Sequence, residues 1–94
     1  MMPYLTQENK DYLNEENHLS SLARTLSEEP VEKFVGELNY MNFLFVKRWI
    51  KKNGKKYFVF AAIIGTLICC VFEIYRKLIA PYEEIKEKEN GSIE

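Results

Sequence analysis

Residues 57–72 read YFVFAAIIGTLICCVF, sixteen consecutive residues without a charge. An α-helix rises about 1.5 Å per residue, so this run is about 24 Å long and falls short of the roughly 30 Å hydrocarbon core of a bilayer. A helix that extends to Ile79 is long enough to cross this core. Composition and length therefore predict one transmembrane helix over residues 57–79 in an all-α, single-pass membrane protein.

Glu73 is the acidic residue inside this predicted span, close to its second end. Arg76 follows it by three residues and Lys77 by four, and side chains at these spacings meet on a helix and can form ion pairs. Pairing and snorkelling let the three charges lie at the membrane interface. We interpret Glu73 as an interface residue; the alternative is a buried contact with a partner subunit.

Beyond the span, Pro81 is expected to end the helix after Ala80, because a proline disfavours helical backbone in the residue before it. Residues 80–94 are predicted to form a charged, solvated and flexible tail. Asn90-Gly91-Ser92 in this tail is a glycosylation sequon, which is usable if this end of the chain faces the lumen of the endoplasmic reticulum.

Charge is strongly segregated along the chain. Residues 1–46 carry eight acids and three bases, residues 47–56 carry six bases and no acid, and residues 57–94 carry six acids and four bases. A basic block beside an apolar run favours orientation at a membrane over nucleic-acid binding, and it predicts an N-terminus in the cytosol or the mitochondrial matrix. The residues expected to set this topology are Lys47, Arg48, Lys51, Lys52, Lys55 and Lys56.

An amphipathic interfacial helix is predicted over residues 27–52. Ser27 is a suitable N-cap, Glu28 and Glu29 suit the positive end of a helix, and Pro30 is tolerated in the first turn. Apolar residues then recur at steps of three or four and form one stripe: Val31, Phe34, Val35, Leu38, Met41, Phe45 and Trp49. Residues 53–56 are expected to form a basic hinge, since Asn53-Gly54 can take positive φ at little cost.

Residues 1–26 form a polar segment. Leu19, Leu22 and Leu26 have helical spacing, but the residues around Asn14–Asn17 are so polar that we expect either a weak or partner-induced helix or a segment that is disordered alone. The segment has no basic-then-apolar start, which argues against a cleavable signal peptide, and its acids argue against a mitochondrial presequence.

The residue types do not assemble a plausible catalytic site. His18 is the single histidine and lies in a polar segment, and there is no glycine-rich phosphate loop. Cys69 and Cys70 are neighbours that point about 100° apart on a helix, which makes a disulfide between them unfavourable and leaves too few ligands for a metal. We expect no enzyme activity, cofactor, metal, small-molecule substrate or nucleic acid.

Contact with a larger, multi-spanning membrane protein is the expected mode of action. Ala61, Gly65 and Cys69 form a strip of small residues at steps of four, which allows close helix approach, although an ordinary lipid-facing surface has the same composition. The residues predicted to bind a partner, besides the lipid bilayer itself, are Phe34, Leu38, Phe45, Ala61, Gly65, Cys69 and Glu73.

This order of elements resembles the SecE/gamma subunit of the Sec protein-conducting channel. The similarity covers about residues 28–81, although Lys52-Asn53-Gly54 replaces that family's Pro-Asp-like turn. The residues that carry it are Pro30-Val31-Glu32, Phe34-Val35, Phe45-Val46-Lys47-Arg48, Lys51, Asn53, Lys55, Tyr57, Lys77-Leu78-Ile79 and Pro81. The resemblance implies a surface helix packed on the cytosolic face of the channel and a membrane helix that braces its two halves, in the endoplasmic reticulum.

Two other classes of small membrane protein stay open. The run Phe60–Tyr75, followed by Tyr82-Glu83-Glu84 and alternating Lys and Glu, is similar to small cytochrome oxidase assembly proteins. This similarity implies a respiratory subunit or assembly factor in the mitochondrial inner membrane, with its N-terminus in the matrix. The other class is a regulatory micropeptide that binds a transporter or channel.

Overall fold

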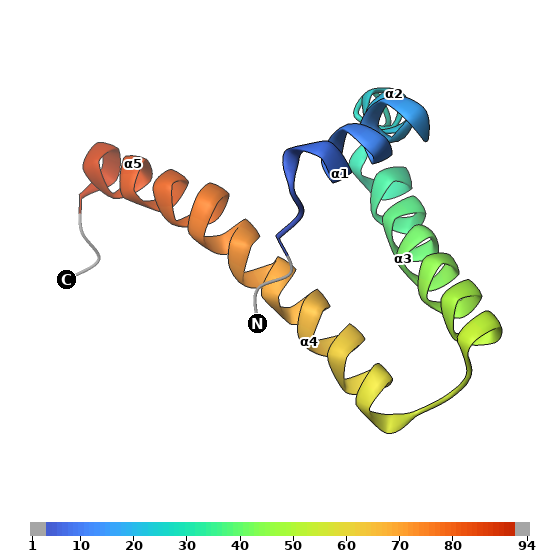
Figure 1. The fold of residues 1–94 in the computed structure, drawn as a ribbon. Helices are drawn as coiled ribbons and strands as arrows, with labels where there is room; N and C mark the ends of the chain where they lie inside the picture. The colour runs from blue at the N-terminus through green and yellow to red at the C-terminus, as the bar shows by residue number, and fades with distance from the viewer. Residues whose placement is uncertain (1–3, 92–94) are drawn as a thin grey trace. The chain divides into compact units, whose positions relative to one another are not determined.

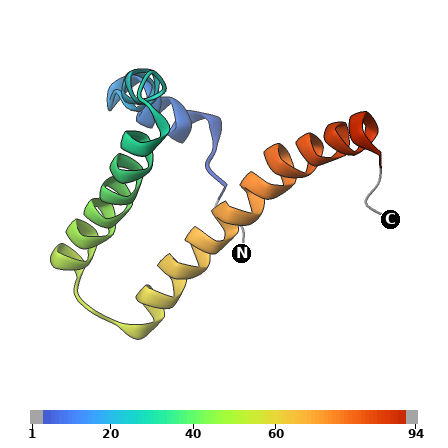
Figure 2. The same ribbon diagram turned by 180° about the vertical axis from the view of Figure 1, so that it is seen from behind.

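A computed structural model describes residues 4–91, which form helices and short connections and contain no strand. This confirms the predicted all-α class. The chain divides between Lys55 and Lys56 into two units. Figures 1 and 2 show the helices of both units from opposite sides.

The first unit begins with α1, Gln7–Asp11, which continues into the π-helical segment η1, Tyr12–Glu16. The Thr6 hydroxyl caps α1 by accepting a hydrogen bond from the Asn9 amide at 3.2 Å. His18 then takes a left-handed backbone conformation, with φ of 61°, between η1 and the next helix. The N-terminal segment that we expected to be weakly helical is thus helical over most of its described length.

Helices α2, Leu19–Leu26, and α3, Val31–Asn53, complete this unit. The prediction that Ser27 caps the second of these is wrong, because Ser27 instead ends α2 and its hydroxyl donates to the Arg24 carbonyl at 2.6 Å. Pro30 stands at the N-cap of α3. A proline keeps the preceding residue out of helical backbone, so α3 begins after it and excludes Glu28 and Glu29.

Helix α3 is 23 residues long and ends at Asn53. The Asn53 side-chain amide donates to the Trp49 carbonyl at 2.9 Å, and the Gly54 amide donates to the Ile50 carbonyl at 2.8 Å. Gly54 has φ of 96°, the positive value that the sequence predicts for this position. Only a residue without a Cβ takes this backbone conformation readily.

The second unit is one continuous helix, made of α4, Tyr57–Ile74, the π-helical segment η2, Tyr75–Ile79, and α5, Ala80–Asn90. The expected stop at Pro81 is therefore wrong. The Ala80 amide donates to the Tyr75 carbonyl, five residues back, instead of four. A proline ring clashes with the carbonyl four residues earlier in a regular α-helix, and a local π-turn rearranges the backbone hydrogen bonds next to it.

Candidate functional site

The helix from Tyr57 to Asn90 is 34 residues long and is apolar enough to cross a membrane. None of its most apolar stretch is buried inside the protein, and Phe58, Ile64 and Phe72 are largely exposed. A helix that is apolar on all sides needs a cover of protein or lipid. The sequence-based prediction of one candidate span is thus confirmed.

Polar groups within this helix are satisfied locally. The Thr66 hydroxyl donates to the Ala62 carbonyl at 2.8 Å, which removes an unpaired donor from an apolar surface. Cys69 and Cys70 are both free thiols. A Cβ built on Gly65 would meet nothing within 4 Å, so the helix surface at this member of the Ala61, Gly65 and Cys69 strip is open among the described residues. Its role in helix contact stays a prediction.

Glu73 forms ion pairs with the two basic residues that follow it by three and four positions. Its carboxylate lies 3.2 Å from the Lys77 ammonium and also pairs with the Arg76 guanidinium. The Glu73 side chain is 22% exposed, whereas the two basic side chains are well exposed. One carboxylate therefore holds two cations whose heads extend toward solvent, an arrangement suited to a headgroup region.

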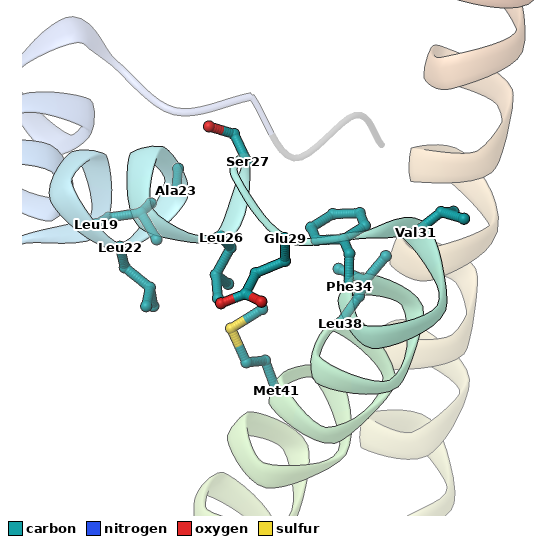
Figure 3. A pocket seen from close by; sticks show the side chains of 10 residues that line it. All are labelled: Leu19, Leu22, Ala23, Leu26, Ser27, Glu29, Val31, Phe34, Leu38 and Met41. Atoms are coloured by element: carbon teal, nitrogen blue, oxygen red, sulfur yellow. The ribbon is translucent and has the colours of Figure 1, made fainter.

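Helices α2 and α3, with the residues that connect them, line an open apolar groove of about 540 Å³, which we call the α2–α3 groove (Figure 3). Phe34 and Leu38, two of the predicted partner contacts, line this groove, but Phe45 does not and is 60% exposed further along α3. The residues that line it are Leu19, Leu22, Ala23, Leu26, Ser27, Glu29, Val31, Phe34, Leu38 and Met41.

A second hollow, which we call the Glu37 groove, has a volume of about 570 Å³. It shares Leu22, Leu26 and Met41 with the α2–α3 groove, so these three side chains lie between the two. Leu26 is only 8% exposed and lines both grooves together with residues of α3. The remaining residues that line the Glu37 groove are Glu32, Lys33, Gly36, Glu37 and Tyr40.

Acidic groups dominate the electrostatics around the Glu37 groove. The Lys33 ammonium lies 3.1 Å from the Glu29 carboxylate, and the hydrogen bond and charge of Glu29, with a smaller effect from Glu37, raise the pKa of Lys33. The Oε1 oxygen of Glu37 is buried and accepts no hydrogen bond from any residue between 4 and 91. Sequence reasoning missed Glu37, since its burial depends on the neighbouring α2 helix.

The basic cluster, defined as Lys47, Arg48, Lys51, Lys52, Lys55 and Lys56, lies in the sequence at the end of α3 and in the connection to α4. All six side chains are exposed, and none forms an ion pair with another residue of the described 4–91 range. The Lys56 ammonium lies 6.0 Å from the centroid of the Phe58 ring. Over the same range, the structure groups no three His, Cys, Asp or Glu side chains that could hold a metal ion.

Comparison with known proteins gives one result at the level of sequence families. A family model described as Domain of unknown function (DUF6899) matches residues 2–93, which include both structural units. No curated protein and no solved structure matches the chain.

Proposed function

This chain belongs to the family described as Domain of unknown function (DUF6899), and from the surfaces of this member we propose that it is a small single-pass membrane subunit that braces a larger membrane complex. The observation that carries the proposal is the uncharged run of residues 57–72 on a helix whose apolar stretch is nowhere buried inside the protein. An exposed apolar surface of this extent would drive association in water, and a bilayer covers it on every side.

The proposed crossing extends from Tyr57 to Ile79. These 23 residues give a helix of about 35 Å, enough for the roughly 30 Å hydrocarbon core. The ion pairs of Glu73 would then lie near one headgroup region, and the basic cluster would lie at the other. Helix α5 would extend beyond the membrane as a charged rod.

Orientation in this proposal follows from the basic cluster. We expect the combined substitutions Lys51→Glu, Lys52→Glu, Lys55→Glu and Lys56→Glu to weaken insertion with the N-terminus inside, because positive charge is retained on the cytosolic or matrix side. The measurement is protection of epitopes at the two ends of the chain from a protease added outside. A pattern identical to that of the wild-type chain would show that the cluster does not set the orientation.

The α2–α3 unit is the proposed docking surface for the larger complex. Its grooves combine apolar walls with carboxylates from Glu29, Glu32 and Glu37. A buried carboxylate oxygen without a donor is costly, and a guanidinium or ammonium from a partner would satisfy the one on Glu37. The occupant that fits this surface is therefore a basic amphipathic helix from an extramembrane part of a multi-spanning protein.

The experiment that tests this proposal is affinity purification of the tagged full-length chain from native membranes in mild detergent. We expect Glu37→Gln to reduce recovery of the partner about tenfold, because a charge-assisted hydrogen bond contributes about 1.5–3 kcal/mol. The fold should be kept, since the Oε1 oxygen of Glu37 accepts no hydrogen bond from the described residues. Glu84→Gln, which neutralises an exposed carboxylate of α5, is the matched control. Equal recovery by both variants would refute the role of Glu37.

The first candidate for the larger complex is the Sec protein-conducting channel, on the strength of the resemblance over residues 28–81. The location would then be the endoplasmic reticulum, with a cytosolic N-terminus. Recovery of a multi-spanning channel subunit by the same purification supports this assignment. Recovery of respiratory subunits would instead favour the mitochondrial inner membrane, and recovery of a transporter would favour a regulatory micropeptide.

A further inference from the structure

The positive charge of the basic cluster is not neutralised by other described side chains. Lys51 and Lys52 lie in the last turn of α3, where cations offset the negative end of the helix dipole. Lys47 and Lys51, like Arg48 and Lys52, lie four residues apart on this helix, a spacing at which like charges repel. No described residue forms an ion pair with any member of the cluster. An external anionic group would relieve the repulsion.

Two aromatic residues accompany these cations and indicate the kind of anion. Trp49, within the cluster, is 49% exposed, and Tyr57, directly after it, is 94% exposed. Trp and Tyr are enriched at the headgroup level of membranes, where one side of the ring meets apolar chains and the other meets water. Cations and aromatic rings next to an uncharged run match a phospholipid surface better than an extended nucleic acid.

We propose that the basic cluster binds the headgroups of anionic phospholipids on the N-terminal side of the membrane. The inference rests on the proposed membrane crossing and specifies the lipid that this end of the chain prefers. The phosphate and carboxylate groups of such lipids supply the missing countercharge. Each Lys or Arg at an anionic surface strengthens binding about fivefold, and this effect decreases with added salt.

The single tryptophan of the chain makes this preference measurable, because Trp49 lies inside the cluster. The full-length chain is reconstituted in phosphatidylcholine vesicles that contain a minor fraction of phosphatidylserine. Energy transfer from Trp49 is then compared for a trace of dansyl-labelled phosphatidylserine and for dansyl-labelled phosphatidylcholine. We expect transfer to the anionic label to be about two- to threefold higher at low salt and to approach parity at high salt.

Neutral variants separate the cluster from charge elsewhere in the chain. The combined substitutions K47Q, R48Q, K51Q, K52Q, K55Q and K56Q should bring the transfer ratio to about one. The matched control, K86Q with K88Q, removes two exposed cations from α5 and should keep the wild-type ratio. A wild-type ratio of one, or an unchanged ratio in the six-residue variant, would overturn the inference.

Alkaline carbonate extraction of the same vesicles distinguishes failure of this inference from failure of the membrane crossing. A wild-type chain that resists extraction but shows no headgroup preference refutes lipid binding alone, whereas a chain that is extracted refutes the crossing on which it depends. Binding of an RNA oligonucleotide in detergent through the same six residues, together with a transfer ratio of one, would assign the cluster to nucleic acid and overturn the inference.

Discussion

The combined substitutions Ile64→Asp and Ile68→Asp are expected to move this chain from the membrane fraction to the soluble or aggregated fraction. The two residues lie four positions apart, on one face of α4 near the middle of the proposed span. A charged residue at the centre of a transmembrane helix costs about 2.5–3.5 kcal/mol for insertion, so the pair costs about 5–7 kcal/mol. The measurement is the fraction of the chain that floats with the membranes in a density gradient after alkaline carbonate extraction, since aggregates do not float.

Ile85→Asp is the matched control for this experiment, because it makes the same chemical change at an exposed residue of α5 outside the proposed span. It should leave retention unchanged. Continued retention of the double variant would contradict the proposed crossing. So would extraction of the wild-type chain, since another protein surface would then have to cover the apolar helix.

Local sequence patterns predicted the structure correctly where a feature depends on the residues of one element alone. The absence of charge over residues 57–72 predicts a helix able to span a membrane, and the spacings from Glu73 to Arg76 and Lys77 predict ion pairs that the structure contains. Gly54 has its expected positive φ. The ion pairs and the Gly54 backbone depend on chemistry within about one helical turn, and the candidate span depends on the composition of a single helix.

The errors at helix ends arise from competition between neighbouring residues. Ser27 has the chemistry of an N-cap, but the restriction that Pro30 places on Glu29 delays the start of α3, and Ser27 then serves as the cap of the preceding helix. Pro81 is a helix breaker in isolation, but the π-turn over Tyr75–Ile79 accommodates it. Neither outcome follows from the conformational preference of Ser27 or of Pro81 alone.

The α2–α3 groove could not be located from the sequence, because it depends on contact between two helices. The spacing of Leu19, Leu22 and Leu26 indicates an apolar face on α2, but not the surface that this face covers. Its position on α3 buries Leu26 and shields one oxygen of Glu37 from solvent. The candidate site in this unit is therefore a property of packing, although Phe34 and Leu38 were identified from their stripe.

Leu26→Ala is expected to detach α2 from α3. Leu26 is the buried apolar residue of α2 and lines both grooves. Truncating a buried leucine to alanine lowers stability by about 2–5 kcal/mol. We expect the lower end of this range, about 2 kcal/mol, because the core of this unit is thin. Amide hydrogen exchange of Leu19–Leu26 in the full-length chain should then become about 30-fold faster, while exchange in α4 stays unchanged.

Leu5→Ala provides the comparison, because it shortens an exposed leucine that precedes α1 and lines neither groove. A surface truncation of this kind changes stability by less than about 0.5 kcal/mol. If Leu26→Ala also leaves the exchange of α2 unchanged, Leu26 does not hold this helix in place. If α2 detaches, the walls of both grooves are lost, and partner recovery should fall even though Glu37 is intact. If Glu37→Gln lowers partner recovery but leaves the amide exchange of α2 unchanged, the loss is due to the missing charge. It is then not due to a change in the fold of the docking surface.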